Sequence, residues 1–542
     1  MKTSTRIGLG FTLFFLILNQ QAFSQSDEDI FQSDNSFGIS SEASPEATKT
    51  ESSANEFDAI DSSPDFTDFG TSDSANDLSG GFKAQSSAPR FELAGMLEIE
   101  RGGRVDVDED RDQDWTLDNI RVRVKSNGSS QSARYYLKLD FVQDSVIRET
   151  HVDIREARIL FTPLNWMDIS VGKQVSTWGV GDMLFINDLF PKNWVANFAG
   201  QEMEYLKDGS NSIRMTSYFG MSGGVDIVFH PQFAPDTTPD GCRFSIYNPN
   251  SMLDPTQPEL MASAEYCDLD STTGKNKMTD SELATRWFFK VSDFEVSFYT
   301  YSGFYKNPKG LQWLDAEGKA SGNSDPFQTH GYTALTSDYP GLNVLGFSLE
   351  GQLGNGILSW ESGFYQSKDD LDGEELFIEN SSVKNLIGYR LDLSASVFIG
   401  FQWYAELMQN YDSYEESILA LYQTQYQAIM AAQGQTVSAQ EAMDWAREQE
   451  LFKYRREELQ NTYTLRLTLK FMQETLFLNT FVYERPEDHD RFVKLDIKKQ
   501  MDNALSFALG VNLFEGDDHY LSREFAMLKQ DDNAFVRMNY QF

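Results

Sequence analysis

Charged side chains recur at alternate positions in several short segments of the chain. Because alternate residues of a β-strand share one face, these side chains form a charged surface if the segments are strands. A row of bases on a confined surface attracts anions. The alternative is that the bases pair across strands with acids such as Glu98, Glu100 and Asp140 and so brace a sheet. The residues concerned are Arg121, Arg123, Arg134, Lys138, Glu156, Arg158, Arg466, Lys494 and Arg537.

The composition excludes several functional classes and contains one contradiction. The 542 residues include 83 acids and 45 bases, and the formal net charge of −38 would repel nucleic acid. Two Cys and five His are too few for a cysteine-rich zinc module. The mean hydropathy is −0.45, yet 13% of the residues are aromatic. Strands with aromatic rings on one face and polar residues on the other would account for both values.

The N-terminal segment has the pattern of a secretory signal. Lys2 and Arg6 precede a short apolar core at residues 11–18, and Ala22 and Ser24 fit a small-x-small cleavage site. We therefore expect Sec-dependent export, with residues 1–24 as the signal peptide. Residues 25–89 are rich in Ser, Asp and Glu and hold 14 acids but only 2 bases. This composition predicts a disordered acidic periplasmic tail.

The C-terminal residues alternate between apolar and polar types. Counting back from Phe542 in steps of two gives Tyr540 and then three further apolar residues, as in a strand with one apolar face. This pattern resembles the C-terminal signature of Gram-negative outer-membrane β-barrel proteins. The resemblance implies that Tyr540 and Phe542 form a membrane-insertion signal and that the barrel-assembly machinery is a partner.

From residue 90 onward the chain repeats the order strand, short turn, strand, long loop. The clearest hairpin joins residues 462–471 to residues 475–483. When the strands are numbered from residue 90, the junction from an even-numbered strand to the next is short and the junction from an odd-numbered strand to the next is long. This alternation is typical of a transmembrane antiparallel β-barrel. The fold class predicted for residues 90–542 is therefore all-β, a barrel of about 18 strands, with 16 to 18 compatible with the pattern. The strands begin near residues 90, 114, 133, 150, 166, 210, 223, 284, 294, 343, 356, 384, 397, 461, 475, 491, 504 and 533.

Two groups of short motifs resemble a particular class of such barrels. Residues 155–158 (Arg-Glu-Ala-Arg), 171–174 (Val-Gly-Lys-Gln) and 178–182 (Trp-Gly-Val-Gly-Asp) resemble the early hairpin of porin-like and alginate-export-like outer-membrane proteins. Residues 386–390 and 402–404 are similar to that class as well. The resemblance covers most of residues 90–542 and implies an outer-membrane barrel, while its loose motifs do not specify a transported solute.

In such a barrel the apolar alternates face lipid and the others face the lumen. The nine charged residues named above are then candidate pore-lining residues. The inward positions together carry 15 bases and 11 acids, a sum of about +4, although the whole chain carries −38. The alternation slips near residues 154–157 and at Lys173, which indicates a β-bulge.

Two predicted surface loops have features of their own. Residues 179–208 contain Phe185, Phe190 and Trp194, which need cover, so this loop could fold inward as a constriction. Residues 411–460 have apolar residues at helical spacing and a capping box at Ser438, and predict a helical insertion that covers the mouth, binds a partner or packs on itself.

Cysteine and acidic residues mark two further loop features. Cys242 and Cys267 lie in one loop, and an exported chain with two cysteines favours a disulfide over free thiols. Asp106, Asp108 and Asp110 belong to an acidic run that could hold Ca²⁺ weakly, but the run lacks the Gly and the final Glu of an EF-hand. A solvated acidic loop is the alternative.

The leading functional hypothesis is a porin-like channel for passive diffusion of small hydrophilic solutes, with a preference for anions. The alternative is a plugged structural barrel whose surface loops bind a partner or polymer. We expect no enzymatic activity, no cofactor and no nucleic-acid partner. The expected partners are a small solute, outer-membrane lipid and lipopolysaccharide of a Gram-negative bacterium, and further copies of the chain in a homotrimer.

Overall fold

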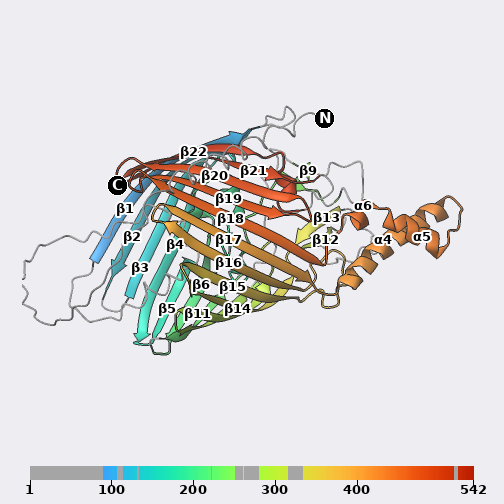
Figure 1. The fold of residues 1–542 in the computed structure, drawn as a ribbon, viewed down its shortest axis with the longest axis horizontal. Helices are drawn as coiled ribbons and strands as arrows, with labels where there is room; N and C mark the ends of the chain where they lie inside the picture. Colours follow the sequence, from blue (N-terminus) through green and yellow to red (C-terminus); the bar gives the residue numbers. More distant parts are fainter. Residues whose placement is uncertain are drawn as a thin grey trace, which may run out of the picture. The chain divides into compact units, whose positions relative to one another are not determined.

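The described part of the chain is a closed β-barrel. The computed structural model describes residues 90–105, 114–130, 133–220, 222–248, 250, 260–261, 280–314, 334–517 and 523–542. Within these residues 18 antiparallel strands form one sheet, and its first and last strands pair with each other (Figure 1). Closure leaves no strand edge without hydrogen-bond partners, which is the requirement for strands inside a bilayer. The predicted fold class and strand number are confirmed.

Each strand begins within two residues of its predicted start. The barrel strands are β1 (Arg90–Arg104), β2 (Trp115–Ser129), β3 (Ala133–Asp144), β4 (Glu149–Leu164), β5 (Met167–Val175), β6 (Gly209–Tyr218), β7 (Gly223–His230), β10 (Glu282–Val291), β11 (Phe294–Phe304), β14 (Gly341–Leu353), β15 (Gly356–Ser367), β16 (Ser382–Ser394), β17 (Val397–Met408), β18 (Leu459–Phe471), β19 (Leu476–Arg485), β20 (Asp490–Gln500), β21 (Leu505–Glu515) and β22 (Asn533–Gln541). Every strand pairs with the next one along the chain.

Junction lengths follow the predicted parity with two exceptions. None of the eight even-to-odd junctions exceeds four residues, and seven of the nine odd-to-even junctions are long. The exceptions are residues 145–148 and 486–489, which are short turns where the prediction required long loops. The prediction that long and short junctions alternate along the whole chain is therefore wrong at these two hairpins. Nothing prevents two strands from meeting in a tight turn at the end of the barrel that carries the long loops.

The described loops contain a few short elements. Two small sheets pair β8 (Ile246–Tyr247) with β9 (Leu260–Met261), and β12 (Gly310–Leu314) with β13 (Ala334–Asp338). The α-helices are α3 (Trp194–Phe198), α4 (Tyr411–Ala432), α5 (Ala439–Arg447) and α6 (Glu450–Lys453), and the 3₁₀ helices are η1 (Met203–Tyr205) and η6 (Ala526–Leu528). In the part of the chain that the structure describes, every helix is too short or too polar to cross a bilayer.

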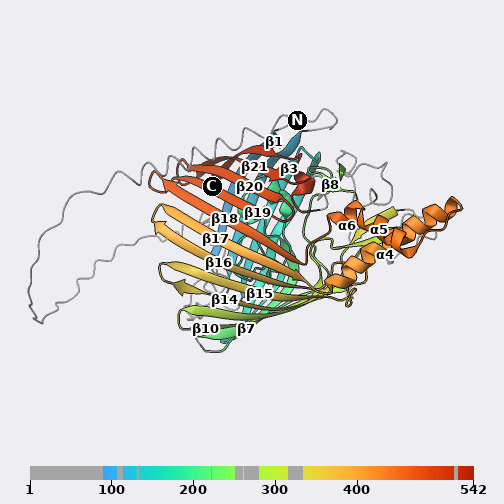
Figure 2. The ribbon, with the colours of Figure 1, turned by 45° about the vertical axis from the view of Figure 1, so that its right-hand side comes forward.

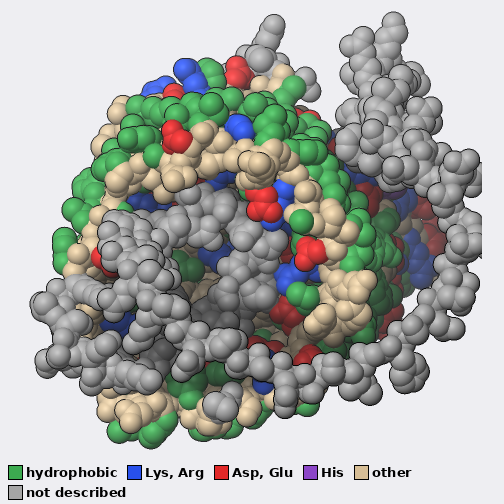
Figure 3. Space-filling model, turned by 60° about the vertical axis from the view of Figure 1, so that its left-hand side comes forward, with side chains coloured by type: hydrophobic (Ala, Val, Ile, Leu, Met, Phe, Trp, Pro, Cys, Tyr) green, Lys and Arg blue, Asp and Glu red, His purple; other side chains and the backbone are tan. Residues whose placement is uncertain are grey.

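The outer face of the barrel is apolar. Large hydrophobic side chains remain exposed on it, and Figure 3 shows them around the outside of the wall. A soluble monomer rarely exposes so continuous an apolar surface, whereas lipid would cover it. These outward residues include Ile99, Ile120, Phe141, Val171, Trp287, Phe298, Leu345, Trp360, Phe401, Leu465, Phe507 and Val536.

The predicted helical insertion is present and packs on itself. Helices α4 to α6 extend from the end of the barrel that lies opposite the C-terminus (Figures 1 and 2). The capping box between Ser438 and Glu441 starts α5 as predicted. Trp445 of α5 stacks on Tyr426 of α4 with ring centroids 4.9 Å apart and also contacts Tyr422. These contacts favour self-packing of the insertion over cover of the barrel mouth.

The pairing of β1 with β22, which closes the barrel, continues to the last residue of the chain. Phe542 donates its N–H to the carbonyl of Gly95 at 2.9 Å and accepts the Gly95 N–H at 2.8 Å. Its ring lies over Gly95, where a Cβ would approach the ring to 2.2 Å, so a larger residue at this position would displace the Phe542 ring. The Phe542 and Tyr540 rings stack 6.2 Å apart and are exposed on the outer face.

Because Phe542 is exposed, its predicted role as an insertion signal can be tested separately from its contribution to stability. We expect Phe542→Ala to lower the yield of protein in the outer membrane severalfold, while the barrel that does form should unfold like Phe507→Ala. Both rings are exposed on the lipid-facing side, 68% for Phe542 and 43% for Phe507, so both variants lose contact with lipid. Quantitative blotting of outer-membrane fractions and urea unfolding test this. Equal yields of the two variants would contradict an insertion signal at the C-terminus.

Candidate functional site

The long junction between β5 and β6, residues 176–208, runs inside the barrel and is called the inward loop below. Its residues contact inward side chains of strands all around the wall, including β1, β2, β15, β18, β20 and β22. Phe190 is only 2% exposed and packs edge-on against Trp178 with centroids 4.9 Å apart. The expectation that residues 179–208 fold inward is confirmed.

One carboxylate on β15 anchors the first half of the inward loop. Glu361 is fully buried and accepts backbone N–H groups from Val180 at 3.0 Å, Gly181 at 3.1 Å and Asn187 at 2.6 Å. Gly179 has φ +80, and a Cβ there would lie 2.5 Å from the Glu361 carboxylate, so the approach requires glycine. Three N–H groups that share one carboxyl group hold this half of the loop against the wall.

Two predicted pore-lining bases hold the second half of the loop. Lys494 of β20 donates to the Asn197 side-chain oxygen at 3.0 Å and to its carbonyl at 3.3 Å. Arg537 of β22 donates to the carbonyl of Gly200 at 2.8 Å. Gly200 has φ +86, and a Cβ there would clash with a wall ring at 2.1 Å. Both bases face inward as predicted, but they bind loop carbonyls.

Arg123 joins the wall to the loop near β1–β4. It makes two hydrogen bonds to Asp140 of β3, at 2.6 and 2.7 Å, and a third to Glu204 of the loop. Burial raises the pKa of Glu204. The positive charges of Arg123, Lys138 and Lys125 lower it by more, so the pKa falls to about 2. Glu204 therefore stays ionised, and its contribution to the loop's anchorage is present above its ordinary pKa and is lost only as the pH falls toward 2.

Arg121 lies beside Arg123 and is surrounded by acids. Its guanidinium is 3.5 Å from Glu98 and 4.0 Å from Glu100, and it stacks 3.9 Å above the Tyr205 ring of the loop. Tyr205 donates to Glu98 at 2.8 Å, so the same carboxylate serves wall and loop. Burial raises the pKa of Tyr205 well above its usual value, which keeps the hydroxyl protonated as a donor.

The other predicted pore-lining residues on β3, β4 and β18 are also inward. Glu156 lies 3.3 Å from Lys138 and 3.4 Å from Arg158. Arg134 is half-buried on β3. Arg466 is 4% exposed and lies 2.6 Å from Asp182 of the loop. At least five of the eight bases thus have an acid within 4 Å, which favours the bracing interpretation over an open row of bases; these five are Arg121, Arg123, Lys138, Arg158 and Arg466.

Arg155 belongs to the site although the sequence did not single it out. The pairing of β3 with β4 shifts register between Lys138 and Leu139, so Arg155 has no cross-strand partner and its side chain is buried. It donates to the Lys207 carbonyl at 2.8 Å and approaches Asp208 at 3.2 Å. This is the β-bulge that the slip at residues 154–157 predicted. The slip was the signal that could have identified Arg155.

Aromatic rings fill part of the lumen, contrary to the expectation that the rings mostly face lipid. Phe198 of α3 packs against five rings with centroid distances of 5.7 to 6.3 Å, among them Phe492 and Phe514 on the wall. Asn512 and Asn533 donate to the Phe198 carbonyl at 2.8 and 3.1 Å. Fully burying one such ring stabilises the loop by about 2–3 kcal/mol. A second apolar cluster surrounds Trp178.

The remaining predicted site residues lie at the loop end or outside the described residues. Cys242 is disulfide-bonded, while its expected partner Cys267 lies outside the described residues. Phe244, two residues on, is fully buried in the same cluster as Phe198. The acidic run with Asp106, Asp108 and Asp110 also lies outside the described residues. Among the described side chains no group of acids, His and Cys has the arrangement of a metal site.

Comparisons with known proteins reach only the level of the fold. No family model matches the chain, and no curated protein sequence matches it. Among solved structures, Pseudomonas aeruginosa OccK11 (OpdR) is 9% identical, with 83% of this chain and 96% of that chain covered and a TM-score of 0.43. Salmonella typhi OmpF in complex with daunomycin is 7% identical over 83% and 97% of the two chains, with a TM-score of 0.37. A loop L8 deletion mutant of OmpT, an outer membrane protein of Vibrio cholerae, is 9% identical over 84% and 100%, with a TM-score of 0.36.

Removing the charge of Glu361 tests the anchorage of the inward loop. We expect Glu361→Gln to weaken the loop's attachment by about 1–3 kcal/mol, because one of the two oxygens that accept these N–H groups becomes an NH₂ donor. Hydrogen–deuterium exchange across residues 176–208 should accelerate. Glu295→Gln is the matched control, since Glu295 pairs with Arg286 on the wall. Exchange equal to that of the control would show that Glu361 does not hold the loop.

Proposed function

We propose that this chain is a passive channel in the outer membrane of a Gram-negative bacterium, through which small hydrophilic solutes diffuse. The observation that supports this most is a loop tethered across the interior of a closed barrel with a charged inner wall. At the end with the short turns the barrel is hollowed, and Lys, Arg, Asp and Glu side chains are visible within the hollow (Figure 3). The outer face of the barrel is apolar, as a membrane channel requires, because lipid must cover it.

The inward loop serves as the constriction of the proposed channel. Its two apolar clusters, around Phe198 and Trp178, exclude water from part of the cross-section. The polar stretch between them, which includes Asp182, faces wall side chains such as Gln402 and Arg466. A solute therefore has a narrow polar path beside the loop, and the channel admits only small molecules.

Charge pairing limits the selectivity of the proposed channel. The inward bases attract anions, but most of them have an acid or a carbonyl at hydrogen-bond distance, so their fields are largely cancelled at longer range. The channel is accordingly weakly anion-preferring, and size matters more than charge.

Reconstitution in planar bilayers tests the channel directly. We expect discrete conductance steps, a reversal potential in a salt gradient that shows a weak preference for Cl⁻ over K⁺, and block by solutes too large to pass the inward loop. The narrow polar path predicts steps smaller than those of a barrel whose loop has been removed. An insulating barrel whose fold is verified by circular dichroism would contradict the proposal.

A second candidate function is a scaffold whose surface insertion binds a partner. The observation that favours it is the extension of α4 and α5 away from the barrel (Figure 2), where their packing on each other leaves the opposite faces open to solvent. Arg456, at the base of the insertion, pairs with Glu379 and lies 3.7 Å from Glu406 of β17, so the insertion is fixed to the barrel end.

Replacing residues 411–453 with a short Gly-Ser linker separates the two candidates. Because the helices pack on themselves, we expect the shortened barrel to fold and to conduct like the complete chain. A matched variant, Trp445→Ala, should loosen α4 from α5 without shortening the loop, and should also conduct normally. Loss of conductance in the linker variant with retained folding would show that the insertion belongs to the transport path.

The assembly and the segment assignments remain predictions. They comprise a signal peptide at residues 1–24, an acidic periplasmic tail at 25–89, insertion by the barrel-assembly machinery, contact with lipopolysaccharide and a homotrimeric state. The acidity of the tail, 14 acids against 2 bases, supports its placement in solvent.

A further inference from the structure

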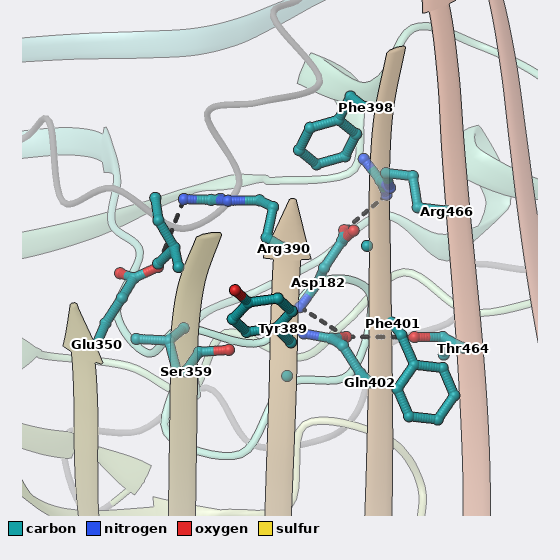
Figure 4. Close-up of a pocket in the computed structure, with 14 residues that line it drawn as sticks. Asp182, Glu350, Ser359, Tyr389, Arg390, Phe398, Phe401, Gln402, Thr464 and Arg466 are labelled. Atoms are coloured by element: carbon teal, nitrogen blue, oxygen red, sulfur yellow. Dashed lines mark hydrogen bonds and ion pairs between the residues drawn. The ribbon is translucent and has the colours of Figure 1, made fainter. Parts of the chain in front are cut away.

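A pocket lies between the inward loop and the inner wall of β14–β18 (Figure 4). About 470 Å³ of space lies among its lining atoms, and this figure counts the part that is open to the lumen. Val180 and Asp182 border it from the loop. Ile357 and Phe398 line it at the second positions of β15 and β17, directly after short turns, so the pocket faces the end of the barrel with the short turns.

The strand register places a glycine between two arginines in this pocket. Arg390 of β16 pairs with Gly400 of β17, and Gly400 pairs in turn with Arg466 of β18. The two arginine Cα atoms are therefore about 10 Å apart, two strand spacings. A Cβ at Gly400 would meet nothing closer than 3.9 Å. The missing side chain leaves open space with a guanidinium on each side.

Two carboxylates balance the two guanidinium groups. Arg466 lies 2.6 Å from Asp182, and Arg390 lies 3.6 Å from Glu350. The pocket thus holds two acidic and two basic groups, so a ligand with a single charged group would pair with only one kind of them. The Asp182 and Glu350 side chains are 21% and 16% exposed, so each can still accept a hydrogen bond from a ligand.

The rest of the lining is mixed in polarity. Ser359 and Thr464 contribute hydroxyl groups, and Gln402 is fixed by hydrogen bonds to the Asp182 N–H at 3.2 Å and to the Thr464 hydroxyl at 3.4 Å. Phe398 is 5% exposed and forms an apolar wall. A ligand that suits this lining has a carboxylate, an ammonium group and a small apolar portion.

We propose that the pocket binds free α-amino acids as zwitterions, an inference that rests on the proposed channel and specifies its solute class. The ligand carboxylate lies over Gly400 within reach of Arg390 and Arg466. The ammonium group reaches Asp182 or Glu350, and the side chain packs against Phe398. Because the zwitterion brings one charge of each sign, it satisfies both kinds of wall group without leaving an uncompensated charge beside the loop.

Binding by the full chain folded in detergent tests the proposal with three matched probes. L-Leucine carries both charges, 4-methylpentanoate lacks the amino group and 3-methylbutylamine lacks the carboxylate. Titration calorimetry should show that leucine binds about 10- to 100-fold more tightly than either analogue, the range expected for one charge-assisted hydrogen bond. Equal affinity for 4-methylpentanoate would establish a simple carboxylate site and overturn the proposal, as would the absence of leucine binding.

Three variants locate the site. Gly400→Val keeps every charge but fills the space between the arginines, and should abolish leucine binding; a β-branched residue suits a strand at this open position. Arg390→Gln should weaken binding about 10-fold or more by removing one charged donor. Lys470→Gln is the control, since Lys470 lies on the same strand as Arg466, pairs with Glu474 and does not line the pocket. Leucine binding that survives Gly400→Val in the folded barrel would place any ligand elsewhere.

Binding and conduction fail separately. A barrel that binds leucine but is silent in a bilayer would overturn the channel and leave the site in place. A barrel that conducts but binds no leucine would overturn the site and leave the channel. In a conducting barrel, leucine should also interrupt the current in wild type and in Lys470→Gln, and should leave the current through Gly400→Val unchanged.

Discussion

A chain segment enclosed in a barrel must find partners for its own N–H and C=O groups, since bulk water does not reach them freely. In this protein the wall supplies those partners. Glu361 accepts three N–H groups of the inward loop, and Lys494 and Arg537 donate to its carbonyls. Several inward charges are thereby committed to the loop. The geometry of the lumen follows from this backbone requirement.

The two halves of the loop are anchored by different physics. Around Phe198 the anchor is a cluster of buried rings, whose contacts are nondirectional and exclude water. Around Glu361 the anchor is a set of charged hydrogen bonds, which fix the backbone but leave polar surface beside it. A path for hydrophilic solutes therefore belongs on the side of Asp182 and the β14–β18 wall, where the pocket lies.

The sequence predicts the strands well because lipid imposes a period of two on the outer face. The inner face obeys no such rule, and apart from the two short turns at residues 145–148 and 486–489 the errors lie there. Arg155 faces inward only because a β-bulge shifts the alternation of inward and outward side chains. The slip in the sequence pattern marks the bulge but does not say which residue it turns inward. The ring-filled part of the lumen is marked in the sequence by adjacent apolar pairs such as Phe492–Val493 and Phe535–Val536, where both faces are apolar. The partner of each inward base depends on where a distant loop folds, and no local pattern encodes that.

Local pairing also changes what a charged wall can do. A base beside an acid has the field of a dipole, which falls off quickly, so it draws few ions from a distance. At contact the same pair can still exchange hydrogen bonds with a ligand that presents both signs. The net charge of −38 consequently says little about permeation, because the charges nearest the path are matched in place. Selectivity in such a lumen arises where a side chain is missing from the inner face of the wall, as at Gly400, so that a solute can approach both members of a charged pair.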